Sequence, residues 1–302
     1  PNGTRPRPLV RWVIGQQGAS CSQWGMRRIP PTLDPHTPRA PRRTLPRRAP
    51  RTRARDTDEP RSLWQRYWRR GLLGLLLLGL SLTIVPVLML RVIPPLTSSF
   101  MVGYQLDRLA NPDLPALRHA WVPWNDIAPS AKLAVIAAED QHFADHFGLD
   151  LAAIQRAREH NRRGRTLRGA STISQQVAKN LFLWSGRSWL RKGLEAWFTV
   201  LIEALWGKRR IMEVYLNVVE LGRGVYGAEA GARHYYGHGA ERLSEREAAR
   251  LAAILPQPIK RSAATPGRQT RRYAGTIDAR INVVRRDGLD ARGRLRPGGG
   301  GR

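Results

Sequence analysis

The chain has 302 residues, 42% of them hydrophobic, which is enough to bury one substantial core and still leave long tails. Lys and Arg number 51 against 23 Asp and Glu, and the formal net charge of +28 at pH 7 indicates a polyanionic partner: nucleic acid, an anionic membrane face or a phosphorylated substrate. The single cysteine, Cys21, excludes a disulfide framework and a zinc site built from cysteines.

The N-terminal region is dominated by arginine and proline. Residues 1–62 contain runs such as PRAPRRTLPRRAPRTRARD and show no apolar periodicity. A segment of this composition cannot bury enough apolar surface to fold. We therefore predict a solvated, disordered arm over residues 1–70. Met26, in MRRIPP, is a candidate start of the native chain, and we assign no function before it.

Residues 71–92 predict a transmembrane anchor. The run GLLGLLLLGLSLTIVPVLML is uncharged and mostly apolar, and about 20 such residues cross the roughly 30 Å hydrocarbon core of a bilayer as a helix. The basic arm before it predicts that the N-terminus stays in the cytoplasm. Three aromatic residues on that side can form an interfacial belt: Trp64, Tyr67 and Trp68. The alternatives are a buried core helix and a cleaved signal peptide, but no A-x-A-like site follows the run.

Residues 93–285 predict one mainly helical domain, and residues 286–302 a disordered tail. Residues 97–106, TSSFMVGYQL, are expected to lie at the membrane surface. Helix starts are predicted at four polar residues, of which the last two open capping boxes: Ser130, Asp150, Thr172 and Ser244. Helix ends are predicted at Gly207, at Gly222 and before Pro256.

An acid pair, Glu139 and Asp140, ends the apolar helix of VIAAEDQHFADHFG, residues 135–148. Desolvation and the negative end of the helix dipole would raise the pKa of Glu139 toward values useful for proton transfer, whereas nearby cations would lower it. Asp140 points about 100° around any continuing helix, so we expect it to orient neighbours rather than share a proton. The alternative is that Glu139 has only a structural role, as a cap or an ion-pair partner.

Two further segments carry polar and basic residues at helix starts. GASTISQQVAKNLFL, residues 169–183, offers free N–H groups and hydroxyls that suit an anion or a sugar, and Lys179 adds a charge. In GRSWLRKGLE, Arg191 and Glu195 share one helical face. That spacing fits either a site for an anionic substrate or an ordinary surface salt bridge.

In this order and spacing, the segments resemble glycosyltransferase family 51, the peptidoglycan glycosyltransferases that polymerise lipid II. The resemblance covers about residues 93–285 and is closest to the monofunctional subgroup of Gram-negative bacteria, which has a single anchor helix. Five blocks carry it: EDQHFADHFG, GASTISQQVAKN, RKGLE, KRRIMEVYLNVVELGRGVYGAEAGARHYYG and LSEREAARLAAILPQP. The resemblance implies a mainly α, lysozyme-like, two-lobed glycosyltransferase domain after a single N-terminal transmembrane helix.

The resemblance also implies residue roles. Glu139 would be the general base that deprotonates the 4-hydroxyl of the acceptor N-acetylglucosamine, which attacks the anomeric carbon of the donor chain with inversion to a β-1,4 bond. Glu195 matches a second essential carboxylate, near the diphosphate or its cation. Four basic residues match those that neutralise the leaving undecaprenyl diphosphate: Lys179, Arg187, Arg191 and Arg156. Further motif positions, which would bind substrate or shape the cleft, are Gln175, Gln176, Ser171, Asn180, Asp140, Phe143, His146 and Gly148.

The implied partners are lipid II, the nascent glycan strand and lipids of the bacterial inner membrane, with the catalytic domain in the periplasm. Proteins of cell division and cell-wall synthesis are candidate partners, and nucleic acid is not. No cofactor is required for the chemistry, although some relatives use Mg²⁺ or a similar divalent cation. No metal ligand is assigned.

Two other functions remain open at this stage. Paired carboxylates and a lysozyme-like fold also fit a membrane-anchored lytic enzyme that cleaves glycan strands. A hydrolase of neutral sugar linkages, however, has no need of cations placed to receive a diphosphate. A membrane-tethered nucleic-acid-binding protein is the third hypothesis; it rests on the Arg-rich arm, and no nucleic-acid-binding motif accompanies that charge.

Overall fold

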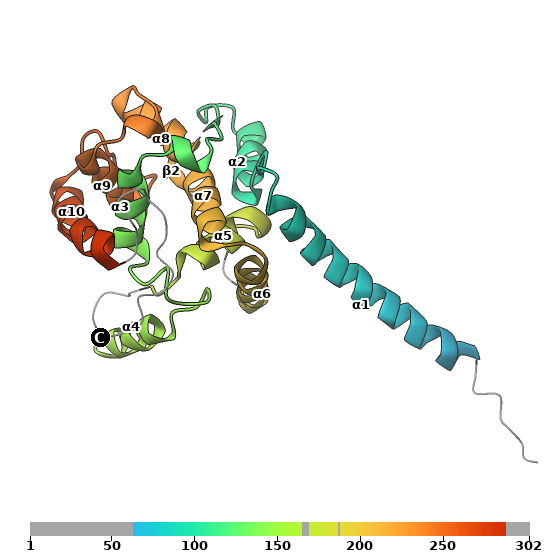
Figure 1. Cartoon of the computed structure of the whole chain (residues 1–302). Helices are drawn as coiled ribbons and strands as arrows, with labels where there is room; N and C mark the ends of the chain where they lie inside the picture. Colours follow the sequence, from blue (N-terminus) through green and yellow to red (C-terminus); the bar gives the residue numbers. More distant parts are fainter. Residues whose placement is uncertain (1–62, 165–168, 187, 288–302) are drawn as a thin grey trace, which may run out of the picture. The chain divides into compact units, whose positions relative to one another are not determined.

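The computed structural model describes residues 63–164, 169–186 and 188–287, and these are mainly helical, as predicted (Figure 1). The predicted arm over residues 1–62 and the tail from residue 288 lie outside the described residues. The helices are α1 Leu63–Leu90, α2 Ser99–Ala110, α3 Pro129–Glu139, α4 Leu151–Arg162, α5 Ile173–Phe182, α6 Trp189–Leu205, α7 Lys208–Val218, α8 Ala228–Tyr236, α9 Glu245–Ile254 and α10 Arg268–Asp287. Two short 3-10 helices are η1 Trp124–Asp126 and η2 Ala240–Arg242.

A small sheet completes the described fold. Its strands are β1 Arg118–His119, β2 Glu220–Gly222 and β3 Val225–Tyr226, in the order β1-β3-β2. The central strand β3 runs parallel to β1 and antiparallel to β2. The sheet therefore joins the chain just before α3 to the chain just after α7.

Helix α1 has the properties of a membrane anchor. Its segment Tyr67–Leu90 has a mean hydropathy of 2.5, and only 6% of that window is buried inside the protein. A core helix of a soluble protein would be mostly buried, so this exposure argues against that alternative. The helix begins at Leu63, which means that residues 63–70, predicted as part of the disordered arm, are helical.

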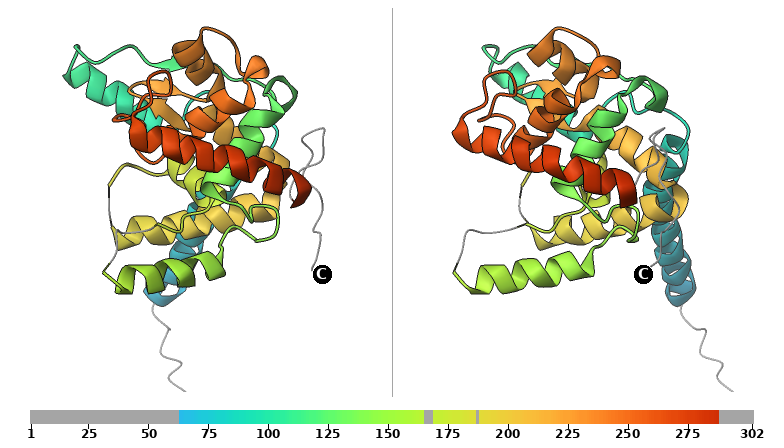
Figure 2. Two further views of the ribbon diagram at one scale, coloured as in Figure 1. Left: turned by 90° about the vertical axis from the view of Figure 1, so that its left-hand side faces the viewer. Right: turned by 60° about the vertical axis from the view of Figure 1, so that its left-hand side comes forward.

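The helical domain that follows α1 contains two groups of helices. In one group α3 packs against both α9 and α10, and in the other α5 packs against α6 and α7. Figure 2 shows α10, in red, along the side of the domain that carries α3 and α9. Helix α3 can lie between other helices because its residues 130–137 are all buried and several of them are alanine. This arrangement agrees with the expected two-lobed layout.

The predicted helix starts are confirmed at three of four positions. Asp150 caps α4, and capping boxes open α5 at Thr172 and α9 at Ser244. The prediction for Ser130 is wrong: α3 begins at Pro129, whose fixed φ starts a helix without a side-chain cap. The Ser130 hydroxyl instead donates to the Leu243 carbonyl at 2.5 Å, which ties α3 to the segment before α9.

Gly207 directly follows the C-cap of α6, as predicted, and α9 ends before Pro256 as predicted, whereas the helix end predicted at Gly222 is wrong. Helix α6 ends at Leu205, and Gly207 takes an extended conformation with φ −79° as the N-cap of α7. Helix α7 ends at Val218, and Gly222 closes strand β2. The chain leaves the helix after Val218 because Glu220–Gly222 pair with β3 to form the small sheet.

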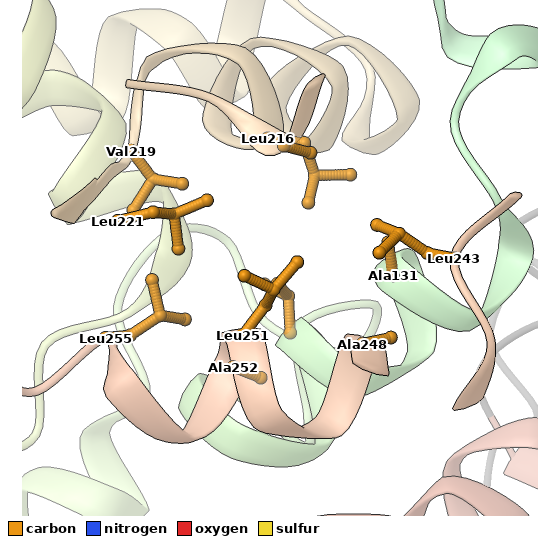
Figure 3. Close-up of a pocket in the computed structure, with 11 residues that line it drawn as sticks. Ala131, Leu216, Val219, Leu221, Leu243, Ala248, Leu251, Ala252 and Leu255 are labelled. Atoms are coloured by element: carbon orange, nitrogen blue, oxygen red, sulfur yellow. The ribbon is translucent and has the colours of Figure 1, made fainter. Parts of the chain in front are cut away.

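An apolar pocket lies between α3, α7 and α9 (Figure 3). Its walls are alanine, valine and leucine side chains, among them Ala131, Leu216 and Leu251. A space lined only by aliphatic groups offers no acid, base or charge, so this pocket belongs to the packing of the core and not to a catalytic site.

The loop that follows the acid pair makes a close approach to α6 at Gly148. Gly148 has φ +75°, and its carbonyl accepts a hydrogen bond from Thr172 Oγ1 at 2.6 Å. A Cβ atom here would lie 2.6 Å from Thr199 Cγ2 and 2.9 Å from Glu203 Cγ. Glycine is therefore required both for the left-handed backbone and for the contact between the loop and the helix.

We expect Gly148→Ala to lower the free energy of unfolding by about 2–4 kcal/mol, because it combines left-handed strain with overpacking. Gly275→Ala in α10 is the matched control, since no atom lies within 4 Å of the added carbon, and it should stabilise the helix by up to about 1 kcal/mol. Denaturant unfolding in detergent measures both changes. Equal stability of the two variants would contradict the required close approach.

Candidate active site

Glu139 is the last residue of α3 and is partly buried at the edge of the core. Gln176 on α5 donates from Nε2 to Glu139 Oε2 at 2.7 Å. Burial raises the pKa of Glu139 above its ordinary value; the hydrogen bond from Gln176 and the charge of Lys179 act in the opposite direction. The predicted direction of the shift and its main cause, desolvation, are confirmed.

Asp140 holds two neighbouring segments in place. Its Oδ1 lies 2.9 Å from His146 Nε2, which donates because an ionised carboxylate can only accept. Its Oδ2 accepts from the backbone N–H of Ile173 at 3.1 Å, at the first turn of α5. Asp140 is buried and orients its neighbours, as predicted, and its role in binding substrate stays a prediction.

Helix α5 separates the two adjacent glutamines. Gln175 is buried, and its Oε1 accepts from the backbone N–H of Thr172 at 3.1 Å in the capping box. Gln175 is thus the N3 residue of this capping box, and its contact with substrate stays a prediction. Gln176 reaches Glu139 instead. Asn180 is also buried, and Ser171 is exposed just before the helix.

A buried carboxylate, Glu195, lies among basic side chains. Its side chain is 4% exposed; Arg191 Nη1 approaches Oε2 at 3.2 Å, and Lys192 Nζ pairs with Oε1. The salt bridge between Arg191 and Glu195 is therefore present, but it is buried and not on the surface. Burial lowers the pKa of Lys179, while the charges of Glu195 and Glu139 raise it. Lys179 thus interacts electrostatically with both carboxylates and joins them into one site.

Other predicted residues lie apart from this cluster. Arg156 on α4 is exposed, with its Nη2 3.7 Å from Asp150, and no contact found among the described residues links it to Glu139 or Glu195. Arg187 lies outside the described residues. Phe143 is fully buried and packs edge-on against His146, so it shapes the loop and cannot touch a substrate.

Sequence reasoning missed several polar residues of the same region. Glu203 on α6 is buried; it accepts from the Ser174 hydroxyl and pairs with Lys208 Nζ at 2.7 Å. Lys208 also donates to the His146 carbonyl at 2.6 Å, which fixes the loop after the acid pair. A glutamate inside the apolar run TVLIEALWG was the signal for Glu203, since a carboxylate in such a run needs a partner.

Glu220 in β2 is a third carboxylate near Lys179. Burial raises its pKa, and a hydrogen bond with Tyr226 and the charges of Arg223 and Lys179 lower it. Tyr215 on α7 was missed for another reason: it is fully buried among apolar residues and looks like core. Its hydroxyl nevertheless lies 3.3 Å from Gln176 Oε1.

The described residues offer no prepared set of metal ligands. No three His, Cys, Asp or Glu side chains in that part of the chain cluster as a metal site. Both oxygens of Glu195 are paired with cations. A divalent cation therefore does not fit this carboxylate as it stands, and the divalent cation used by some relatives stays a sequence-based expectation.

Comparison with known proteins decides the family. A family model described as transglycosylase matches residues 107–285. The chain belongs to the transglycosylase family. It is 54% identical over 208 residues to a biosynthetic peptidoglycan transglycosylase of Pseudomonas aeruginosa, covering 69% of this chain and 90% of that protein. A protein of the same description from Xanthomonas axonopodis pv. citri is 52% identical over 213 residues, covering 70% and 87%. The resemblance inferred from the five blocks is confirmed.

The raised pKa of Glu139 predicts a pH-dependent effect on stability. A carboxyl whose pKa is higher in the folded state stabilises the fold below about pH 4.5, its value when unfolded, and that contribution is lost as the pH rises through the folded pKa. We therefore expect Glu139→Gln to unfold at a higher temperature than the wild type at pH 7, and the difference to vanish near pH 4. Thermal melts at both pH values measure this.

Glu245→Gln is the control, because Glu245 is half-exposed in an ion pair with Arg285 and is not among the groups that shift the pKa of Glu139. Removing an exposed pair changes stability little. A Glu139→Gln variant less stable than wild type at pH 7 would show that the carboxylate is a structural ion-pair partner.

Proposed function

We propose that this chain is a peptidoglycan glycosyltransferase that polymerises lipid II into β-1,4-linked glycan strands and releases undecaprenyl diphosphate. The observation that carries the proposal is a half-buried base, Glu139, linked through Lys179 to the basic surroundings of Glu195. The relatives named biosynthetic peptidoglycan transglycosylases, at 54% identity, support the same activity.

In the proposed reaction Glu139 takes the proton from the acceptor's 4-hydroxyl as that oxygen bonds to the anomeric carbon of the donor. The bond from that carbon to the diphosphate oxygen breaks, and the leaving diphosphate keeps the electron pair. Lys179 and Arg191 stabilise the charge that develops on it, since fixed cations in a water-poor site contribute most to such a step. Arg156 and Arg187 remain proposed contacts for the diphosphate.

The environment of Glu195 disfavours the lytic alternative. A glycosidase needs its second carboxylate free to activate water or to attack the sugar. Both oxygens of Glu195 are instead engaged by Arg191 and Lys192. The family assignment also leaves the nucleic-acid-binding hypothesis without support, because that hypothesis rested on the charge of the arm.

We expect Glu139→Gln to fold normally and to lose about 100-fold to 10,000-fold of lipid II polymerisation, the usual contribution of a general base. A gel assay with labelled lipid II, run with and without a moenomycin-type inhibitor, measures the product. Glu245→Gln should keep wild-type turnover. Undiminished polymerisation by Glu139→Gln would remove Glu139 from its role, and shortening of mature peptidoglycan without use of lipid II would replace the proposed activity by lysis.

The proposed location is the bacterial inner membrane, crossed once by α1, with the N-terminus in the cytoplasm and the catalytic domain in the periplasm. A substrate held in a bilayer suits an enzyme attached to it. Helix α6 also exposes apolar side chains at its start, Trp189 at 93% and Leu190 at 70%. The position of residues 97–106 at the membrane surface stays a prediction; Met101 is buried, and Val102, Leu106 and Leu109 are the exposed large apolar residues of α2.

The single cysteine allows the orientation to be measured. In intact spheroplasts a membrane-impermeant maleimide should leave Cys21 unlabelled until the cells are lysed, because the arm would be in the cytoplasm. The matched variant combines Cys21→Ser with Gln257→Cys, which places the thiol at an exposed position after α9, and it should label at once. The reverse pattern would overturn the proposed orientation.

A further inference from the structure

A chain of hydrogen bonds runs from the core to the proposed base. Tyr215 on α7 is 0% exposed, and its hydroxyl lies 3.3 Å from Gln176 Oε1. The other end of the same amide donates from Nε2 to Glu139 Oε2 at 2.7 Å. Three side chains from α7, α5 and α3 are thus linked in a line that ends on the carboxylate.

The orientation of the Gln176 amide decides what it does to Glu139. An amide presents a donor at one end and an acceptor at the other. With Nε2 toward Glu139 the amide favours the ionised carboxylate; with Oε1 toward it, the amide would favour the protonated form. Only the ionised form can accept the proton of a sugar hydroxyl, so the first orientation is the productive one.

Tyr215 favours that orientation. Burial raises the pKa of the Tyr215 phenol well above its ordinary value, so the hydroxyl keeps its proton throughout the working pH range. It can therefore donate to Oε1, while the ionised Glu139 can only accept from Nε2. Both ends of the amide then have matched partners. Without the hydroxyl, Oε1 loses its donor and the productive orientation loses one of its two supports.

The backbone of α5 limits how far Gln176 can move. Asp140 accepts from the N–H of Ile173, and the capping box at Thr172 closes the first turn of the same helix. Gln176 follows within this turn. These contacts therefore fix the backbone next to Gln176, and Tyr215 holds its side-chain amide.

We propose that Tyr215 is a positioning residue for the general base, acting through Gln176 to keep an amide N–H directed at the Glu139 carboxylate. This inference rests on the proposed function of Glu139. Tyr215 touches no reacting atom in this scheme. Its effect reaches the reaction only through the amide.

Other charged and titratable groups face this chain and stay in place when Tyr215 is changed. Lys179 of α5 and Asp140 act on Glu139. Asp140 and Tyr273 of α10 act on Tyr215, and the Tyr273 hydroxyl also donates to the Ala138 carbonyl at 3.0 Å. A change in pH dependence caused by removing the Tyr215 hydroxyl can therefore be compared with the wild type in the same surroundings.

The test is the pH profile of kcat/KM for lipid II with the full chain. Tyr215→Phe should move the acidic limb to higher pH by about one unit, equal to a roughly tenfold loss on that limb. At high pH, where Glu139 is ionised in both proteins, the rates should converge. A merely structural role would lower the rate by one factor at every pH. Tyr236→Phe is the matched control, because it removes a hydroxyl that bonds to the Glu247 carbonyl at 3.2 Å, on the other group of helices.

A second variant distinguishes an effect of Tyr215 through Gln176 from a general loss of structure. Gln176→Met should shift the acidic limb in the same direction, and adding Tyr215→Phe to it should cause no further shift, since Tyr215 acts through the amide. Additive shifts, or an unchanged limb in an active Tyr215→Phe, would overturn the proposal. If Tyr215→Phe does not fold, an unchanged limb in Gln176→Met overturns it and a shifted limb supports it. A wild type without polymerising activity would instead overturn the proposed function.

Discussion

The proposed site depends on one conflict: a carboxylate that must be ionised to act as the proposed base ends a helix whose own packing favours the neutral acid. Helix α3 is buried along nearly its whole length, and Glu139 emerges where that burial ends. Desolvation raises its pKa, and only two groups act strongly in the other direction, the Gln176 amide and the Lys179 charge. Both come from α5. The placement of α5 against α3 therefore sets whether the base works, and the polar contacts of Asp140 and Gly148 serve that placement.

The second carboxylate, Glu195, has its charge compensated in a different way. Glu195 is more deeply buried than Glu139, but it is surrounded by Arg191 and Lys192, and Lys179 contributes its charge from α5. A buried charge is tolerated when it is paired and hydrogen-bonded. One cation, Lys179, thus interacts electrostatically with both the proposed base, Glu139, and Glu195. In the proposed reaction, this shared charge links the base to the region that receives the leaving diphosphate.

The sequence predicted features that depend on short stretches of chain. The N-caps at Asp150, Thr172 and Ser244 and the apolar helix before Glu139 could be predicted from local sequence patterns. The family could be predicted in the same way. Features set by distant packing were not predictable. Gln175 and Gln176 look equivalent in the sequence, yet they point about 100° apart on α5, and only the positions of α3 and α7 make one a cap and the other a partner of the base. Gly222 closes a strand because a sheet partner follows it.

The difference between making and breaking a glycan strand then lies in what surrounds the second acid. In a glycosidase that acid must bind or become the nucleophile, which requires a free oxygen on it. Each oxygen of Glu195 is instead paired with a cation, Arg191 on one and Lys192 on the other. The same cations suit a leaving group that departs as an anion, and that anion is a diphosphate in the proposed reaction. A lysozyme-like arrangement of helices can therefore support synthesis when basic residues, here Arg191 and Lys192, lie one turn before its second acid and pair with it.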